Sequence, residues 1–231
     1  FTVTPTTQGT VTVNVGANGA TDAAGNGNTA SNTLSRTYDN VAPTVTSVSS
    51  TTANGSYKAG ATINVTVNFS EVVTVTGTPT ISLDSGGTAS YSSGSGTNSL
   101  VFNYVVLAEQ NSNDLNYAAT NSLSGTIKDA ASNAANLTLP ATNSASSLGG
   151  SKAIIIDTTA PTVFLTTSAP ETTNAAFTVT ATFSESVSVF DSSDISVTNS
   201  TAGTVSGSGS NYTFTVTPTT QGTVTVNVGA N

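Results

Sequence analysis

The first eighteen residues of this chain, FTVTPTTQGTVTVNVGAN, occur again without a mismatch as its last eighteen. Phe1 matches Phe214, which sets a period of 213 residues. Self-similarity at a fixed period is the signature of repeat architectures, and only a recent duplication keeps two copies identical. We therefore expect the 231 residues to be a window of one full period plus a short overlap, taken from a longer array.

The chain is poor in charge but not poor in apolar residues. Charged residues make up 7% of it and hydrophobic residues 36%. Disordered chains have too few apolar side chains to form a core, and this composition does not fit that class. The polar residues are mostly Thr, Ser, Asn and Gly, which suit strands with one solvated face joined by many turns.

Alternation of apolar and polar residues predicts strands along most of the chain. The segments 62–69 (TINVTVNF) and 177–183 (FTVTATF) both follow a period of two, as a strand with one buried face must. No apolar stripe of helical period competes, although residues 112–119 are compatible with one short helical turn. We therefore predict an all-β fold of tandem immunoglobulin-like β-sandwich domains in an elongated array.

Two similar segments divide the chain, DNVAPTV at 39–45 and DTTAPTV at 157–163. Proline lacks a backbone donor and suits the entry to a first strand better than its interior. We predict a complete domain at 41–157, preceded by the C-terminal part of another type at 1–40 and followed by the N-terminal part of that type at 158–231. Residues 158–213 and 1–40 together have the length of a seven-stranded sandwich, about 100 residues.

Three recurring motifs hold half of the twelve acidic residues. One acid lies in each linker, one ends each Phe-Ser-Glu that is expected to close the second strand, and one opens each Asp-Ala-Ala-(Gly/Ser)-Asn loop before a last strand. In that order the acids are Asp39 and Asp157, Glu71 and Glu185, and Asp22 and Asp129.

Strand alternation in a sandwich brings these motifs to one pole of a domain. The complete domain is then expected to gather Asp39, Glu71, Asp129 and Asn133, and the following domain Asp157 and Glu185, with Asp114 as a further ligand. Asp22 and Asn26 are the loop motif of the first partial domain. Clustered carboxylates repel one another, and a hard cation with six to eight oxygen ligands relieves the repulsion, so Ca²⁺ is the expected cofactor. The plainer alternative is that Asp, Asn and Gly are ordinary turn residues here.

The linker, the Phe-Ser-Glu and the Asp-Ala-Ala-Gly-Asn motifs, taken in this order, resemble the bacterial Ig-like repeats of giant surface adhesins and biofilm-associated proteins. The resemblance covers the whole window and departs from the usual motif at Ser132, where glycine is common. It implies an extracellular location at the bacterial surface, a rod-like array in contact with its neighbouring repeats, and Ca²⁺ at domain junctions that stiffens the rod.

Composition excludes several classes of function. The chain has no Cys, Met, Trp or His, which removes disulfides, thiolate or imidazole metal sites and His or Cys catalysis. A net charge of −8 with four cationic residues argues against nucleic acid and anionic membranes as partners. No apolar run approaches the ~18 residues of a membrane span, so no membrane insertion is expected in this segment.

A structural spacer or fibre is the favoured function, since repeated units add length without new chemistry. A glycan- or cell-binding module is the alternative, with Tyr57, Tyr91 and Tyr117 as the aromatic platforms. An enzyme is not expected: Glu71 and Asp129 are a conceivable carboxylate pair for glycoside hydrolysis, but their recurrence in each repeat suits a structural ion better. A Lys–Asn isopeptide bond has no diagnostic spacing here.

A strand-exchange polymer is a further alternative. Residues 1–40 and 158–231 are complementary parts of one domain type, so strand donation from one chain to the next is conceivable. The duplicated strands would compete for one place, which favours a continuous repeat instead.

Overall fold

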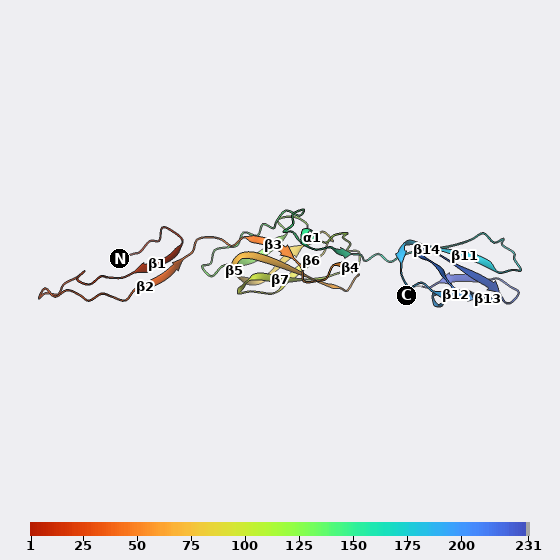
Figure 1. Cartoon of the computed structure of the whole chain (residues 1–231), viewed down its shortest axis with the longest axis horizontal. Coiled ribbons are helices and arrows are strands. Elements are labelled where there is room, and N and C mark those ends of the chain that lie inside the picture. Colours follow the sequence, from red (N-terminus) through yellow and green to blue (C-terminus); the bar gives the residue numbers. More distant parts are fainter. Residues whose placement is uncertain (230–231) are drawn as a thin grey trace. The chain divides into compact units, whose positions relative to one another are not determined.

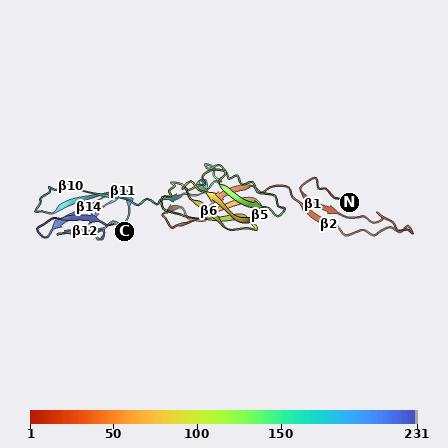
Figure 2. The ribbon, with the colours of Figure 1, turned by 180° about the vertical axis from the view of Figure 1, so that it is seen from behind.

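The computed structural model describes residues 1–229, drawn in Figure 1 and from behind in Figure 2. Two compact units divide it, Phe1–Thr158 and the residues that follow. Strands dominate both units, which confirms the predicted all-β, Ig-like fold class. No helix among the described residues is long and apolar enough to cross a membrane.

The first unit contains nine strands and one short helix within its described residues. They are β1 (Gly9–Val13), β2 (Leu34–Tyr38), β3 (Val45–Ser49), β4 (Gly55–Tyr57), β5 (Thr62–Ser82), β6 (Thr88–Ser93), β7 (Thr97–Val105), β8 (Leu123–Lys128), α1 (Leu148–Ser151) and β9 (Ile154–Ile156). One sheet has the order β3-β5-β6-β7, with β8 also paired to β5, while β4 pairs with β9 in parallel.

The core of this unit follows from the alternation in β5. Ile63, Val65, Val67 and Phe69 are all buried, and the polar residues between them face outward. β7 supplies the next row, because Val65 pairs with Phe102 and Val67 with Leu100.

The last strand of the unit closes the sandwich between two earlier segments. β9 lies parallel to β4, and its other edge bonds to residues 112–115 through Ser112 and Leu115. Ile154 and Ile156 are completely buried, whereas Ile155 is 38% exposed. β9 thus connects β4 to the segment 112–115.

The second unit has a smaller core. Its strands are β10 (Val163–Thr167), β11 (Phe177–Val187), β12 (Ile195–Thr198), β13 (Ser200–Ala202), β14 (Ser206–Pro218) and β15 (Thr225–Val228), with a 3-10 turn at Ser192–Asp194. One sheet has the order β10-β11-β14-β13, and β12 pairs with β15. Val179, Ala181, Phe214 and Val216 are buried between them.

The first forty residues form a hairpin rather than a packed layer. β1 and β2 pair antiparallel, with Val11 opposite Arg36 and Val13 opposite Leu34. None of residues 1–40 is buried in this structure.

Two local expectations are wrong. Phe-Ser-Glu does not close the second strand: β5 continues past Glu71 with a shift of register between Asn68 and Val73, and β11 continues past Glu185. Residues 112–119 form no helical turn, because their backbone bonds to the closing strand β9, and the short helix lies at Leu148–Ser151 instead.

The closing strand gives a first prediction. Ile154→Ala should lower the free energy of unfolding by about 2–5 kcal/mol, because it leaves a cavity in a fully enclosed site. Ile155→Ala is the matched control on the solvent side of the same strand and should cost less than about 1 kcal/mol. Urea unfolding measures both, and equal losses would show that β9 is not seated with Ile154 inward.

Candidate metal centre

Three acidic side chains from distant parts of the sequence meet in the first unit, where the linker enters the domain at 41–157. Ligand oxygens of Asp39, Glu71 and Asp129 all lie within 4.8 Å of one another. Asp129 is buried, with 4% of its surface exposed, and the other two are half-buried. The structure thus brings together the linker, the Phe-Ser-Glu motif and the loop motif at one place.

The linker is held against β5 by a pair of hydrogen bonds next to Glu71. The Thr44 amide donates to the Ser70 hydroxyl at 3.0 Å, and the Ser70 amide donates to the Thr44 carbonyl at 2.8 Å. On the other side, the Pro43 carbonyl accepts from the Asn136 amide at 2.8 Å. These bonds place the end of the linker between Glu71 and the loop that contains Asp129.

The loop at residues 129–133 is organised by its own first carboxylate. Asp129 Oδ1 accepts the Asn133 amide at 2.8 Å, and Oδ2 accepts the Asn133 side-chain amide at 2.8 Å. The same Asn133 Nδ2 donates to the Asp39 carbonyl at 3.2 Å, so the loop also holds the linker. Each carboxylate oxygen has more than one lone pair, and Asp129 keeps capacity for a cation.

The electrostatics of the cluster are those of carboxylates without a counter-charge. Partial burial raises the pKa of Glu71 above its ordinary 4.5, and the negative charges of Asp39 and Asp129 raise it further. Burial also acts to raise the pKa of Asp129, but hydrogen bonds from Asn133 and from the amides of Ala131 and Ser132 outweigh it and lower this pKa. Asp129 therefore stays ionised, whereas the surroundings of Glu71 disfavour its ionised form.

The first hairpin contains the same loop. Asp22 accepts the Asn26 amide at 2.9 Å on Oδ1 and the Asn26 side-chain amide at 2.9 Å on Oδ2, and its pKa is lowered chiefly by the Asn26 side chain. Gly25 has a φ of 89°, and Ser132 at the matching position has a φ of 76°. The departure from glycine leaves the loop geometry unchanged. Asp22 and Asn26 are exposed and belong to no acidic cluster within residues 1–229.

The pair of hydrogen bonds next to Glu71 has a counterpart next to Glu185. The Thr162 amide donates to the Ser184 hydroxyl at 2.9 Å, and the Ser184 amide donates to the Thr162 carbonyl at 2.9 Å, as at Thr44 and Ser70. Glu185 directly follows Ser184 in the second unit, whereas Asp157 lies in the first unit. A site formed by the two remains a prediction.

Asp114 has an acidic neighbour that the sequence did not indicate. Burial raises the pKa of Asp84, and the charge of Asp114 adds to the effect, although hydrogen bonds from Asn116 and Ser112 oppose it. Asp84 lies in an Asp-Ser-Gly-Gly turn, which has no feature that distinguishes it from an ordinary turn.

The tyrosines considered as glycan platforms are not exposed. Tyr117 is buried with 1% of its surface exposed, and its hydroxyl donates to the Pro140 carbonyl. Tyr57 and Tyr91 are half-buried and pack against the core of the first unit. Tyr117 therefore belongs to the core, and Tyr57 and Tyr91 lie partly against it.

A match to a known protein family lies in the second unit and its linker. Residues 157–231 match the bacterial Ig-like domain family. Domains of this family are structural and typically belong to surface proteins. No curated protein matches the chain. The match begins at Asp157, the acid of the second linker. It includes the hydrogen-bonded residues Thr162 and Ser184 and the adjacent Glu185.

The raised pKa of Glu71 predicts an unusual response to acid in the absence of divalent cations. Its contribution to stability is complete below pH 4.5 and is lost as the pH rises through the raised pKa, because the folded state binds this proton more tightly. Asp129 has the opposite effect on stability. Its contribution is present above pH 3.8 and is lost as the pH falls through its lowered pKa. As the pH falls from neutral to 4.5, the wild type should therefore gain stability relative to Glu71→Gln. Thermal unfolding in chelator measures this, and parallel pH curves for the two proteins would contradict it.

The left-handed backbone at Ser132 gives another prediction. Ser132→Gly should raise the free energy of unfolding by about 1 kcal/mol or less, because glycine adopts a φ of 76° without a steric penalty. Ser90→Gly in β6 is the matched control and should lower it by about 0.5–1 kcal/mol. Guanidinium unfolding compares the two, and a loss of stability at both positions would contradict the assignment.

Proposed function

We propose that this chain is a non-catalytic structural segment of a bacterial cell-surface adhesin or extracellular filament. The eighteen residues repeated at a spacing of 213 and the Ig-like match at residues 157–231 support this, since repeated sandwiches extend a protein without adding chemistry. Neighbouring repeats of the same array are its principal partners. The absence of His and Cys from the sequence also favours a structural role over catalysis.

We further propose that Ca²⁺ binds to Asp39, Glu71 and Asp129 and stiffens the junction ahead of the domain at 41–157. The observation that supports this most directly is the meeting of three carboxylates within 4.8 Å, where the charges acting on Glu71 are both negative. Carboxylate oxygens are the ligands that Ca²⁺ prefers, and a divalent charge would remove the repulsion between them.

The position of the cluster explains how an ion would act mechanically. Asp39 belongs to the linker, Glu71 to β5 and Asp129 to the loop after β8. Asn133 already connects the loop to the linker through the Asp39 carbonyl. An ion held by all three carboxylates would add a second and stronger tie, so its removal should free the linker and leave the sandwich folded. By the same logic Asp157 and Glu185 would form the next junction.

Calcium titration of the intact chain tests the proposal. The wild type should bind Ca²⁺ by calorimetry, and its melting temperature should rise with Ca²⁺ concentration because the ion binds only the folded state. Glu71→Gln should weaken binding by about tenfold or more and should also stabilise the cation-free protein, since it removes one of three repelling charges. Glu109→Gln, an exposed acid outside the cluster, is the matched control and should change neither quantity.

Small-angle scattering tests the mechanical part. The distribution of distances should broaden in chelator while the circular dichroism of the folded strands stays unchanged. An unchanged distribution would contradict stiffening. A chain that binds no Ca²⁺ at millimolar concentration would overturn the site itself.

A further inference from the structure

The closing strand β9 is bonded to β4 beyond their three paired residues. The Gly55 amide donates to the Ala153 carbonyl at 3.0 Å, and the Asp157 amide donates to the Tyr57 carbonyl at 3.0 Å. Ahead of β4, the Asn54 side-chain oxygen accepts the Ala153 amide at 3.1 Å. The Asn54 side chain thus adds one more bond at the point where β4 begins.

The opposite edge of the same segment is extended in the same way. Ser112 and Ile156 exchange two backbone hydrogen bonds of 2.8 Å. Past the end of β9, the Thr158 amide donates to the Asn111 side-chain oxygen at 2.7 Å. Two asparagine side chains therefore lengthen the bonded segment, one at each end, so that it runs from residue 153 to residue 158.

The two linkers reach the domain at 41–157 at opposite ends of the first half of β5. At one end, Thr44 is bonded to Ser70. At the other end, Asp157 is bonded to Tyr57, which precedes Thr62 at the start of β5 by five residues. The stretch of strand between these ends spans about 25 Å. The chain therefore enters the domain near β3 and leaves it near β4 (Figure 1).

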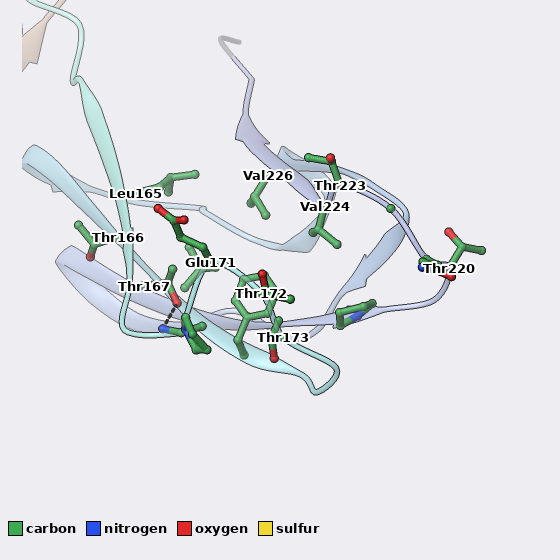
Figure 3. A pocket seen from close by; sticks show the side chains of 17 residues that line it. Leu165, Thr166, Thr167, Glu171, Thr172, Thr173, Thr220, Thr223, Val224 and Val226 are labelled. Atoms are coloured by element: carbon green, nitrogen blue, oxygen red, sulfur yellow. Dashed lines mark hydrogen bonds between the residues drawn. The ribbon is translucent and has the colours of Figure 1, made fainter.

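The turn between β3 and β4 is fixed to β5 by a hydroxyl group. The Ser50 hydroxyl donates to a carbonyl of β5 and accepts the Thr52 amide at 3.0 Å. The second unit has the same turn after β10. There the Thr167 hydroxyl donates to the Thr178 carbonyl at 2.7 Å and accepts the Ala169 amide at 3.2 Å (Figure 3). The turn joins β3 to β4 without slack in the chain.

The direction of the strands decides how tension acts on these bonds. β4 and β9 are parallel, and both run toward the end where the chain leaves the domain. Tension between the linkers pulls the beginning of β3 backward and the end of β9 forward, so β9 is driven along its own axis past β4. Hydrogen bonds between strands cross the strand direction, so this pull loads them together, whereas separating two adjacent strand ends breaks them one after another.

We propose that the segment Ala153–Thr158, held between β4 and residues 111–115, bears end-to-end tension in the domain at 41–157 and limits the rate at which this domain unfolds under load. The buried side chains of Ile154 and Ile156 anchor the segment in the core, and the side chains of Asn54 and Asn111 lengthen it. This inference rests on the proposed structural role, because a chain in an array transmits tension through its domains.

Single-molecule force spectroscopy of the intact chain tests the proposal. The sequence has no cysteine, so two introduced cysteines are unique points of attachment. Asn40→Cys with Ala160→Cys pulls the domain between its linkers, whereas Ala59→Cys with Ala160→Cys pulls apart the adjacent ends of β4 and β9. All three positions are exposed. The unfolding force should be about twofold or more higher between the linkers, because the load is then shared among the bonds.

Asn54→Ala separates a load-bearing role from a general loss of stability. It removes the bond at the far end of the pair from Ala59, the last one to open when the strand ends are pulled apart. Between the linkers it should raise the unfolding rate at constant force about fivefold, as the loss of one hydrogen bond predicts. Between the strand ends it should leave the rate unchanged, whereas a general loss of stability would raise both rates.

Asn103→Ala is the matched control, because it removes an exposed side-chain hydrogen bond of 3.2 Å to Ser92, between β6 and β7. It should change the unfolding rate in neither direction of pulling. Circular dichroism checks that each variant folds.

Two results would overturn the proposal: equal unfolding forces in the two directions of pulling, or an effect of Asn54→Ala that is the same in both. The measurements are made in chelator, so no ion at the carboxylate cluster contributes to them. Such a failure would leave calcium binding and the structural role standing, since a spacer extends a protein without bearing load.

Discussion

The strands of each domain in this chain must enclose an apolar core and pair with their neighbours, and this requirement governs how the parts of the domain are arranged. β9 meets it within the domain at 41–157, because it bonds to β4 on one side and to residues 112–115 on the other. Phe214 meets it in the second unit, where this residue of β14 is buried in the core.

The same requirement places the acids. A sandwich needs its first strand fixed to the second, and the reciprocal bonds between Thr44 and Ser70 do this directly before Glu71. The loop after β8 is held in shape by Asp129, which accepts bonds from Asn133 within that loop. The bonds between Thr44 and Ser70 and the loop of Asp129 thus bring the carboxylates of Glu71 and Asp129 together. The linker residue Asp39 lies beside them. The repulsion among the three carboxylates follows from the way the linker, β5 and the loop pack together. A bound ion would replace this repulsion with a tie between the linker and the domain.

Much of this could be read from the sequence. Period-two alternation predicted the strands at 62–69 and 177–183, because burial of every second residue is a local pattern. The meeting of Asp39, Glu71 and Asp129 followed from strand direction alone. The continuation of β5 beyond Glu71 did not, since a shift of register depends on which neighbours pair with each half of the strand. Residues 112–119 were also misjudged, because their conformation is set by the distant strand β9.

The plain and the functional interpretations of the acidic loop can be separated residue by residue. Asp22 and Asp129 accept the same bonds from Asn26 and Asn133, yet only Asp129 lies in a cluster. The aspartate is therefore explained by the loop whether or not an ion binds. Glu71 is different: within residues 1–229 no hydrogen bond satisfies its carboxylate, and its neighbours are negative. The loop therefore explains Asp129 but not Glu71, and Glu71 is the residue on which the proposed calcium junction and an ordinary turn differ.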